Sequence, residues 1–394
     1  MRWEKVKLGE LCEITSSKRI FFSEYVKKGV PFYRSKEVIE RANGKSVSDE
    51  LYISQDKYDI IKRKFGVPHP GDILLTSVGT IGIPYVVKEN DCFYFKDGNL
   101  TWFRNFGLNL NSMYLYYWIQ SPEGQGVLNN TTIGSSQKAL TITALKELKV
   151  PCPKIDVQNY IVKALKRYDD LIRNNQKQIK LLEEAAQRLY KEWFVDLRFP
   201  GYENTKIVDG VPEGWKRERL VDLVDVQYGY AFDGSLFNTS KKGMPIVRIR
   251  NIPDGSTNDY TTETADSQYI VHNSDILVGM DGEFHINSWS GPDAYLVQRT
   301  CLFRPNNLGM KGYLLQAINE PIKFYESTIV GATVSHLGKK HIDAIAVLTC
   351  PNDKLYEPLQ KYFERRQLLL NQTRLLSEAR DRLLPRLMGD AENF

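Results

Sequence analysis

The sequence predicts an α/β fold in which two similar mixed α/β domains are separated by two long antiparallel coiled-coil helices, with an internal pseudo-twofold repeat. The first observation is a heptad pattern that occurs twice. Apolar residues follow a 4-3 spacing from Ile161 to Trp193, and again 194 residues later from Leu355 to Leu387. Because this spacing gives each helix one apolar stripe, each helix needs a partner, and the other copy is the obvious one.

The second observation is that motifs outside the helices also repeat. The matched pairs are Trp3-x4-Leu8-x2-Leu11 with Trp215-x4-Leu220-x2-Leu223, Gly29-x-Pro31-x2-Arg34 with Gly243-x-Pro245-x2-Arg248, Asp72-Ile73-Leu74-Leu75-x3-Gly79 with Asp275-Ile276-Leu277-Val278-x3-Gly282, and Cys152-Pro153 with Cys350-Pro351. The separation between copies varies between 194 and 214 residues. A shared framework with variable loops is typical of recognition surfaces.

These patterns define four segments: a mixed α/β domain at 1–153, a central helix segment at 154–200, a second mixed domain at 201–350, and a C-terminal helix segment at 351–394. Within the first domain, short β-branched runs predict strands at 30–33, 72–76 and 83–87, and an aromatic run predicts a helix at 113–119. The long helices are expected at 154–196, ending before Pro200-Gly201, and at 354–388.

The heptad positions supply the candidates for helix pairing and partner docking. They are Ile172, Asn175, Ile179, Leu182, Leu189, Trp193, Leu369, Leu376 and Leu383. Asn175 is either a tolerated polar residue or a register pin for antiparallel pairing, since a core Asn can fix alignment. Arg366, Thr373 and Arg380 interrupt the second stripe, so part of it is a candidate surface for another protein.

Composition narrows the class of protein. A chain of 394 residues with 42% hydrophobic residues can form two or three well-packed domains. There is no membrane-spanning run and no signal peptide, and the five cysteines form neither a C-x2-C pair nor an even set. We therefore expect a cytoplasmic protein without a membrane partner, disulfide framework or zinc site. The net charge of +5 is too mild to indicate nucleic acid by itself.

Catalytic motifs are absent from the sequence. There is no G-x4-G-K-[ST] loop and no pair of adjacent prolines, which excludes the Asn/Asp-Pro-Pro-aromatic motif of amino-methyltransferases. The run Asp281-Gly282-Glu283-Phe284-His285 could form a metal or acid/base cluster, but its counterpart Val78–Gly82 carries no ligand. We therefore predict no catalytic and no metal site. The aromatic run Tyr114 to Trp118 is either a base-stacking platform or helix core, and its aliphatic counterparts in the second copy favour core.

Several of these motifs together resemble the specificity subunit of type I restriction-modification systems, over essentially the whole chain. The residues concerned are Leu189-Tyr190-Lys191-Glu192-Trp193-Phe194-Val195-Asp196-Leu197-Arg198-Phe199-Pro200-Gly201, the lead-in Pro151-x-Pro153-x4-Gln158-x2-Ile161, and the strand and turn from Asp72 to Gly82. The second copy departs from the family pattern at Val278–Gly282 and in its helix lead-in.

The resemblance implies a non-catalytic chain with two target recognition domains, each reading one half of a split target in double-stranded DNA. The helices would act as a ruler and dock two methyltransferase subunits, which would methylate adenine at N6 with S-adenosylmethionine. A motor-nuclease (restriction) subunit, where present, would use ATP and Mg²⁺. This chain itself would hold no cofactor.

Candidate DNA contacts are the polar and basic side chains beside the shared turns. They are Arg34, Lys36, Ser77, Thr80, Gln137 and Lys138 in the first copy, and Arg248, Arg250, Asn251, Asp281, Glu283 and Lys339 in the second. Two alternatives remain from the residues alone: a coiled-coil interaction scaffold without sequence-specific DNA readout, and an enzyme with unfamiliar motifs.

Overall fold

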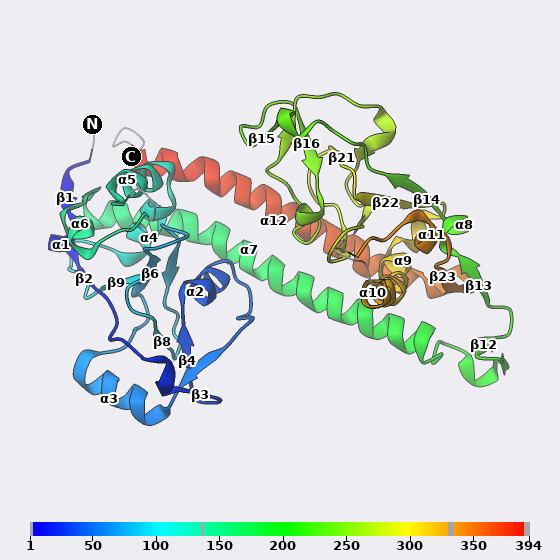
Figure 1. Cartoon of the computed structure of the whole chain (residues 1–394), viewed down its shortest axis with the longest axis horizontal. Coiled ribbons are helices and arrows are strands. Elements are labelled where there is room, and N and C mark those ends of the chain that lie inside the picture. Colours follow the sequence, from blue (N-terminus) through cyan, green and yellow to red (C-terminus); the bar gives the residue numbers. More distant parts are fainter. Residues whose placement is uncertain (1–2, 135–137, 330–334, 390–394) are drawn as a thin grey trace. The chain divides into compact units, whose positions relative to one another are not determined.

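The computed structural model describes residues 3–134, 138–329 and 335–389. The chain divides into two compact units, Met1–Asp169 with Glu378–Phe394 (the first unit) and Asp170–Ser377 (the second unit). Each unit contains one mixed α/β body and one part of each long helix, α7 (Ile155–Tyr190) and α12 (Glu357–Gly389) (Figure 1).

The body of the first unit has a main antiparallel sheet in the order β2-β9-β6-β7 and a smaller sheet in the order β3-β5-β4-β8, in which only β4 and β8 pair in parallel within the described residues. A third pair, β1 with β10, joins the two ends of the body. The elements are β1 (Lys5–Lys7), α1 (Leu8–Leu11), β2 (Glu13–Thr15), β3 (Tyr25–Val26), β4 (Val30–Tyr33), α2 (Ser35–Ala42), β5 (Leu51–Ile53), α3 (Gln55–Phe65), β6 (Ile73–Thr76), β7 (Pro84–Val86), β8 (Tyr94–Phe95), β9 (Leu100–Arg104), α4 (Ser112–Gln120), α5 (Pro122–Thr131), α6 (Ile142–Glu147) and β10 (Lys149–Pro151).

The second unit repeats this topology. Its main sheet runs β14-β22-β19-β20, its smaller sheet β15-β17-β16-β21-β18, and β13 pairs with β23. The elements are β11 (Ile207–Val208), β12 (Val211–Pro212), β13 (Lys216–Arg219), α8 (Leu220–Leu223), β14 (Val224–Tyr228), β15 (Phe237–Asn238), β16 (Met244–Val247), β17 (Tyr260–Thr261), β18 (Ile270–Val271), β19 (Ile276–Gly279), β20 (Ile286–Ser288), β21 (Ala294–Leu296), β22 (Thr300–Pro305), α9 (Lys311–Ala317), α10 (Asn319–Thr328), α11 (Lys339–Asp343) and β23 (Ala346–Thr349). The copies differ most between β4 and β6, where α2 and α3 give way to short 3-10 turns and β18.

The strands and the aromatic helix of the first body lie where the sequence predicts them. Local capping explains the helix bounds: the Asn111 side chain accepts a hydrogen bond from the Met113 amide at the start of α4, and the Ser121 side chain accepts one from Gly124 at the start of α5. Tyr114, Tyr117 and Trp118 are buried against the main sheet. The aromatic run is therefore helix core rather than an exposed stacking platform.

The first long helix changes from α-helical to π-helical geometry at its C-terminal end. After 36 α-helical residues, Lys191–Val195 form a π-helical turn. The extra residue per turn moves the apolar face by one position, so that Phe194 is buried while Trp193, the predicted stripe residue, is only partly buried. Phe194 packs against the rings of Tyr190, Trp215, Tyr313 and Tyr356, with centroids 4.7 to 5.8 Å away.

Burial is compatible with the 194-residue relation between the starts of the two long helices. Ile161 and Leu165 are buried in the core of the first unit, and their counterparts Leu355 and Leu359 are buried in the core of the second. The Cys-Pro pairs that precede the helices are 198 residues apart, so the connections between strand and helix differ in length.

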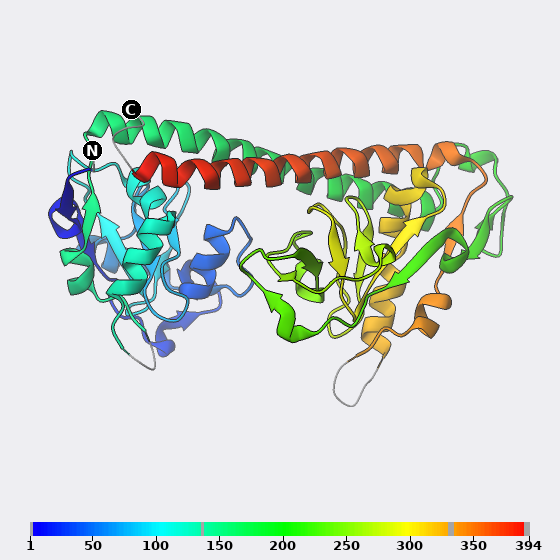
Figure 2. The same ribbon diagram turned by 90° about the horizontal axis from the view of Figure 1, so that it is seen from above.

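Within each unit, α7 and α12 pack against one another (Figure 2). In the first unit, Ile161 and Leu165 share a core with Leu384 and Met388. In the second unit, Ala186 shares a core with Leu359 and Phe363. No helix of the described residues is long and apolar enough to cross a membrane.

Arg366 and Arg380, two of the residues that interrupt the second stripe, pair with acidic side chains of α7. Arg380 Nη1 lies 2.8 Å from Asp169 Oδ1, and Arg366 Nε lies 2.7 Å from Glu183 Oε1. Each pair joins α12 to α7 inside one unit. Burial lowers the pKa of the Arg380 guanidinium, but its bonds to Asp169 and Asp381 outweigh this and raise the pKa overall.

Candidate nucleic-acid interface

Two equivalent hairpin turns carry four of the twelve candidate DNA contacts, Ser77, Thr80, Asp281 and Glu283. The first hairpin turn, residues 77–83, joins β6 to β7, and the second, residues 280–285, joins β19 to β20. Gly79 and Gly282 both have left-handed backbones, with φ of 78° and 68°, as their matched sequence positions predict. Each turn forms an isolated β-bridge to the loop before α6 or α11: Val78 with Ala139, and Asp281 with His336.

A buried aspartate stabilises the base of each hairpin. The carboxylates of Asp72 and Asp275 accept hydrogen bonds of 2.9 Å from the amides of His69 and His272. Burial raises the pKa of the Asp72 carboxyl, while bonds from the His69 amide and the Trp102 indole oppose that rise. The aspartate of the repeated Asp-Ile-Leu motif therefore stabilises the short turn before the first strand of each hairpin, at residues 69–72 and 272–275.

In the first hairpin turn the candidates are not equally accessible. Ser77 is buried, and its hydroxyl lies 2.7 Å from that of Thr101, so an altered turn would be needed for Ser77 to touch DNA. Thr80 in this turn is exposed, and so is Lys138 in the loop before α6. Gln137 lies outside the described residues.

Arg34 begins α2 and is strongly paired. Its backbone amide donates to Glu37 Oε2 at 2.7 Å, and its guanidinium donates to Glu37 Oε1 at 2.5 Å and to Asp49 Oδ2 at 2.8 Å. The Glu37 side chain is completely buried, whereas that of Arg34 is 32% exposed. Bonds from these two carboxylates raise the pKa of Arg34 above its ordinary value. Lys36, two residues further along, is exposed.

The equivalent place in the second unit has the same design with different residues. The Arg248 amide donates to Asn251 Oδ1 at 2.9 Å, and the Arg250 guanidinium donates to Asp259 Oδ1 at 2.6 Å. Asn251 also donates to Asp259 at 3.3 Å. Arg248 lies over the Phe237 ring, 5.5 Å from its centroid. Each copy thus has an arginine–carboxylate pair and a side-chain cap at this place, although a 3-10 turn in the second copy replaces α2.

The second hairpin turn is an ion-paired surface. The Asp281 carboxylate accepts a hydrogen bond of 2.9 Å from the Arg299 guanidinium and lies 2.5 Å from His336 Nδ1. Glu283 and Lys339 are exposed, and Lys339 forms an ion pair with Asp343. In the described ranges, no three His, Cys, Asp or Glu side chains are grouped so that they could hold a metal ion.

The candidates on the long helices fall into two groups by burial. Ile172, Asn175, Ile179 and Leu369 are buried, and Leu182, Leu189, Trp193, Leu376 and Leu383 are partly buried. Asn175 is 6% exposed. The role of Asn175 as a register pin stays a prediction.

Two polar positions escaped the sequence-based candidates. Gln158 is completely buried and donates to the carbonyls of Asn109 and Pro153, both at 2.8 Å, which ties α7 to the start of α4. Arg366 is also buried and bonds to three residues of the second unit. A polar residue at an apolar heptad position was the available signal for Arg366.

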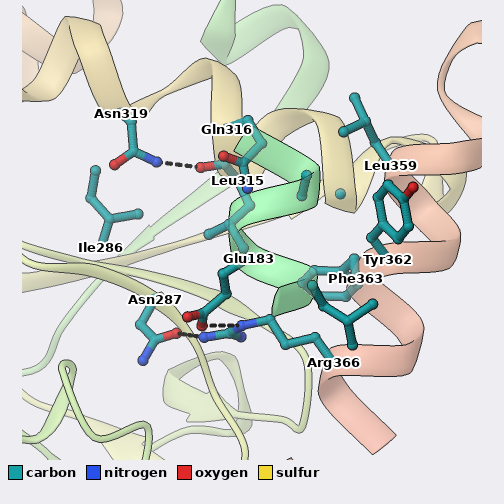
Figure 3. A pocket seen from close by; sticks show the side chains of 13 residues that line it. Glu183, Ile286, Asn287, Leu315, Gln316, Asn319, Leu359, Tyr362, Phe363 and Arg366 are labelled. Carbon is teal, nitrogen blue, oxygen red and sulfur yellow. Dashed lines mark hydrogen bonds and ion pairs between the residues drawn. The ribbon is translucent and has the colours of Figure 1, made fainter. Parts of the chain in front are cut away.

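Arg366 lies at one end of a cavity of about 140 Å³ within the second unit (Figure 3). The cavity is lined by apolar side chains of α7, α9 and α12, among them Leu182, Leu315 and Phe363. Its polar end is formed by Arg366, Glu183 and Asn287.

Comparison with known proteins finds the same family domain in both halves of the chain. A family model described as the type I restriction modification DNA specificity domain matches residues 1–184 and 212–354. The chain is 25% identical over 417 residues to the type I restriction enzyme MjaIX specificity subunit of Methanocaldococcus jannaschii, covering 98% of this chain and 92% of that protein. It is 29% identical over 131 residues to the type I restriction enzyme EcoBI specificity subunit of Escherichia coli, covering 33% and 28%.

A solved structure has the same fold. The crystal structure of the S subunit of a type I restriction-modification system from M. genitalium aligns with a TM-score of 0.56 at 15% identity, covering 99% of this chain and 97% of that one.

The Arg34 cluster makes a prediction about stability. Glu37→Ala should lower the free energy of unfolding by about 2 kcal/mol, because it removes hydrogen bonds to a charged group and the cap of α2. Asp49→Ala is the control, since Asp49 is more than half exposed and its loss should cost under about 1 kcal/mol. Urea denaturation of the two variants measures the difference, and equal losses would contradict the assignment.

Proposed function

Since the chain belongs to the type I restriction modification DNA specificity family, we propose that it is the subunit that reads a bipartite DNA target for such a complex. Each mixed α/β body reads one half of the target, and the long helices set the separation of the halves. The main support is the repeated construction of the two bodies, with the same sheet order and a hairpin turn at the same place. Acting on DNA, the protein would work in the cytoplasm.

Charge and accessibility suggest a division of labour among the candidate DNA contacts. Lys36, Lys138, Arg250 and Lys339 are exposed cations beside the turns and suit phosphate oxygens. Thr80 and Glu283 are exposed at the tips of the turns and suit base edges, where a carboxylate accepts a hydrogen bond from cytosine N4. Arg34 and Arg248, held by their caps, would shape the surface beside these contacts.

The length of α7 supports the ruler. At about 1.5 Å per residue, its 36 residues rise by roughly 54 Å. Along duplex DNA, at about 3.4 Å per base pair, this corresponds to roughly 16 base pairs. A helix of this length suits a target with unread bases between its halves.

Catalysis is assigned to partner subunits. Two methyltransferase subunits would dock on the helices and methylate adenine N6 using S-adenosylmethionine, and a motor-nuclease subunit, where present, would use ATP and Mg²⁺. Exposed leucines on both helices, Leu171, Leu181, Leu368 and Leu375, support docking of a protein there.

The experiment that tests this function is a methylome. The chain is co-expressed with its methyltransferase partner in a host free of adenine methylation, and modified adenines are mapped by sequencing. We expect one split motif with a fixed spacer that disappears when this chain is omitted. Methylation that does not depend on the chain would leave it the role of an interaction scaffold.

The phosphate contacts predict a change in salt dependence. Lys36→Ala with Lys138→Ala should weaken duplex binding by the assembled complex and reduce the slope of log K against log salt concentration by about 1 for each lost contact. Lys149→Ala, exposed on β10, is the control and should leave the slope unchanged. Fluorescence anisotropy at several salt concentrations measures the slope, and an unaltered slope in the double variant would remove both lysines from the interface.

The exposed leucines predict a docking defect. Leu181→Lys with Leu368→Lys should reduce the number of methyltransferase subunits bound, because a charged ammonium would have to be buried at the contact. Val195→Lys, the same aliphatic-to-charged surface change beyond the end of α7, should not reduce it. Native mass spectrometry counts the subunits, and full occupancy in the double variant would place the docking surface elsewhere.

A further inference from the structure

Arg366 is an unusual residue for its position. It occupies a heptad position of α12, and its side chain is only 11% exposed. Burying a guanidinium is costly unless its donors are paired, so an arginine is retained here only with a full set of acceptors. An aliphatic side chain would pack in the stripe without that cost.

The acceptors of Arg366 come from two elements besides its own. Nε donates to Glu183 Oε1 on α7 at 2.7 Å, and Nη2 donates to Asn287 Oδ1 at 2.8 Å (Figure 3). Nη1 donates to Ser288 Oγ at 2.7 Å. Asn287 and Ser288 belong to β20, the strand that leaves the second hairpin turn. One side chain thus connects both long helices to that hairpin.

Gln367 extends the same connection. Its amide nitrogen donates to the Trp289 carbonyl at 2.6 Å and to Asn273 Oδ1 at 3.2 Å, and its oxygen accepts from Ser288 Oγ at 2.9 Å. Asn273 precedes β19, and Trp289 follows β20. The two neighbouring side chains of α12 therefore hold both strands of the hairpin at the end opposite its turn.

Geometry distinguishes this contact from ordinary packing. An apolar contact fixes a distance but tolerates rotation, whereas the planar guanidinium with three directed bonds fixes an orientation as well. Asp281 and Glu283 lie in the turn at the far end of the same two strands. A change in the orientation of the hairpin base is carried along the strands to these residues.

The first unit uses a related arrangement at another heptad of α12. Arg380 pairs with Asp169 of α7, whose second oxygen accepts from the Tyr117 hydroxyl of α4 at 2.5 Å. Asp169 and Glu183 are 14 residues apart along α7, and Arg366 and Arg380 are 14 residues apart along α12. One antiparallel register satisfies both pairs, two heptads apart. A slip of one heptad would put Gln176 or Tyr190 opposite Arg366, and neither is acidic.

We propose that Arg366, with Gln367, is a positioning residue for DNA recognition, which fixes the β19–β20 hairpin to the helix pair and so sets how the second body presents its turn to its half-site. The functional part of this inference rests on the proposed function. The mechanical part, the immobilised hairpin, does not.

The mechanical part is tested by hydrogen exchange in the full chain without DNA. The double variant Arg366→Met, Glu183→Gln removes both charges, so that neither is left buried without its partner. It should speed exchange of the amides of residues 276–289 about tenfold. Residues 73–86, the hairpin of the first unit, should exchange unchanged. Arg366→Lys keeps a positive charge beside Glu183 but lacks the planar guanidinium with its three directed hydrogen bonds. It should therefore be more thermally stable than the double variant and still exchange fast at residues 276–289. Slow exchange at 276–289 in the double variant would overturn the proposal.

The functional part is tested with the assembled methyltransferase complex. Initial methylation rates are measured on targets with single base changes in either half-site. The Arg366→Met, Glu183→Gln variant should lose about tenfold of its discrimination at one half-site and none at the other. Arg380→Met with Asp169→Asn, the matched pair of the first unit, should not relax that same half-site. Equal loss at both half-sites would mean that the residue serves general stability and would overturn the positioning role. If the wild-type complex shows no split target, the proposed function fails. The exchange experiment still decides whether Arg366 and Gln367 immobilise the β19–β20 hairpin.

Discussion

A long amphipathic helix in water must cover its apolar stripe, and in this chain that requirement organises everything else. Neither α7 nor α12 could persist alone, because helix stability in proteins comes mainly from packing of the apolar face. In each unit, the stripe of one helix meets the stripe of the other, and the same side chains continue into the core of the globular body. Ile161 and Leu165 are thus at once helix-pair residues and core residues of the first body. The long helices are therefore part of the hydrophobic core of each body.

This construction explains which parts of the repeat are shared. The segments that contact the helices are the main sheet and the helices α4 and α9, and these recur with the same order and spacing. The copies differ most in the segment between β4 and β6, where α2 and α3 in one correspond to 3-10 turns in the other. In the second copy this segment contacts α12 through Asn273 and Gln367. The charge pairing nevertheless survives the change, with Arg34 and Asp49 replaced by Arg250 and Asp259.

The sequence predicted the architecture because its strongest signals are local and periodic. The two heptad stripes, the repeated Asp-Ile-Leu strand and the aromatic helix are all local patterns of side-chain spacing. The candidate site was less predictable. Ser77 and Thr80 look alike in sequence, but only the sheet pairing buries the first and exposes the second. Arg366 looked like a break in the stripe because its acceptors, Glu183, Asn287 and Ser288, lie about 80 to 180 residues away in the chain.

The first unit contains the last helical residues of the chain: Leu384, Leu387 and Met388 complete the core that Leu8, Tyr114 and Ile161 begin. On the ribosome, the body that is made first is therefore the last to close, and until α12 is finished its core stays open on one side. The second unit, which ends at Ser377, has all its residues before then. Removal of residues 378–389 would therefore open the core of the first unit while leaving the residues of the second unit in place.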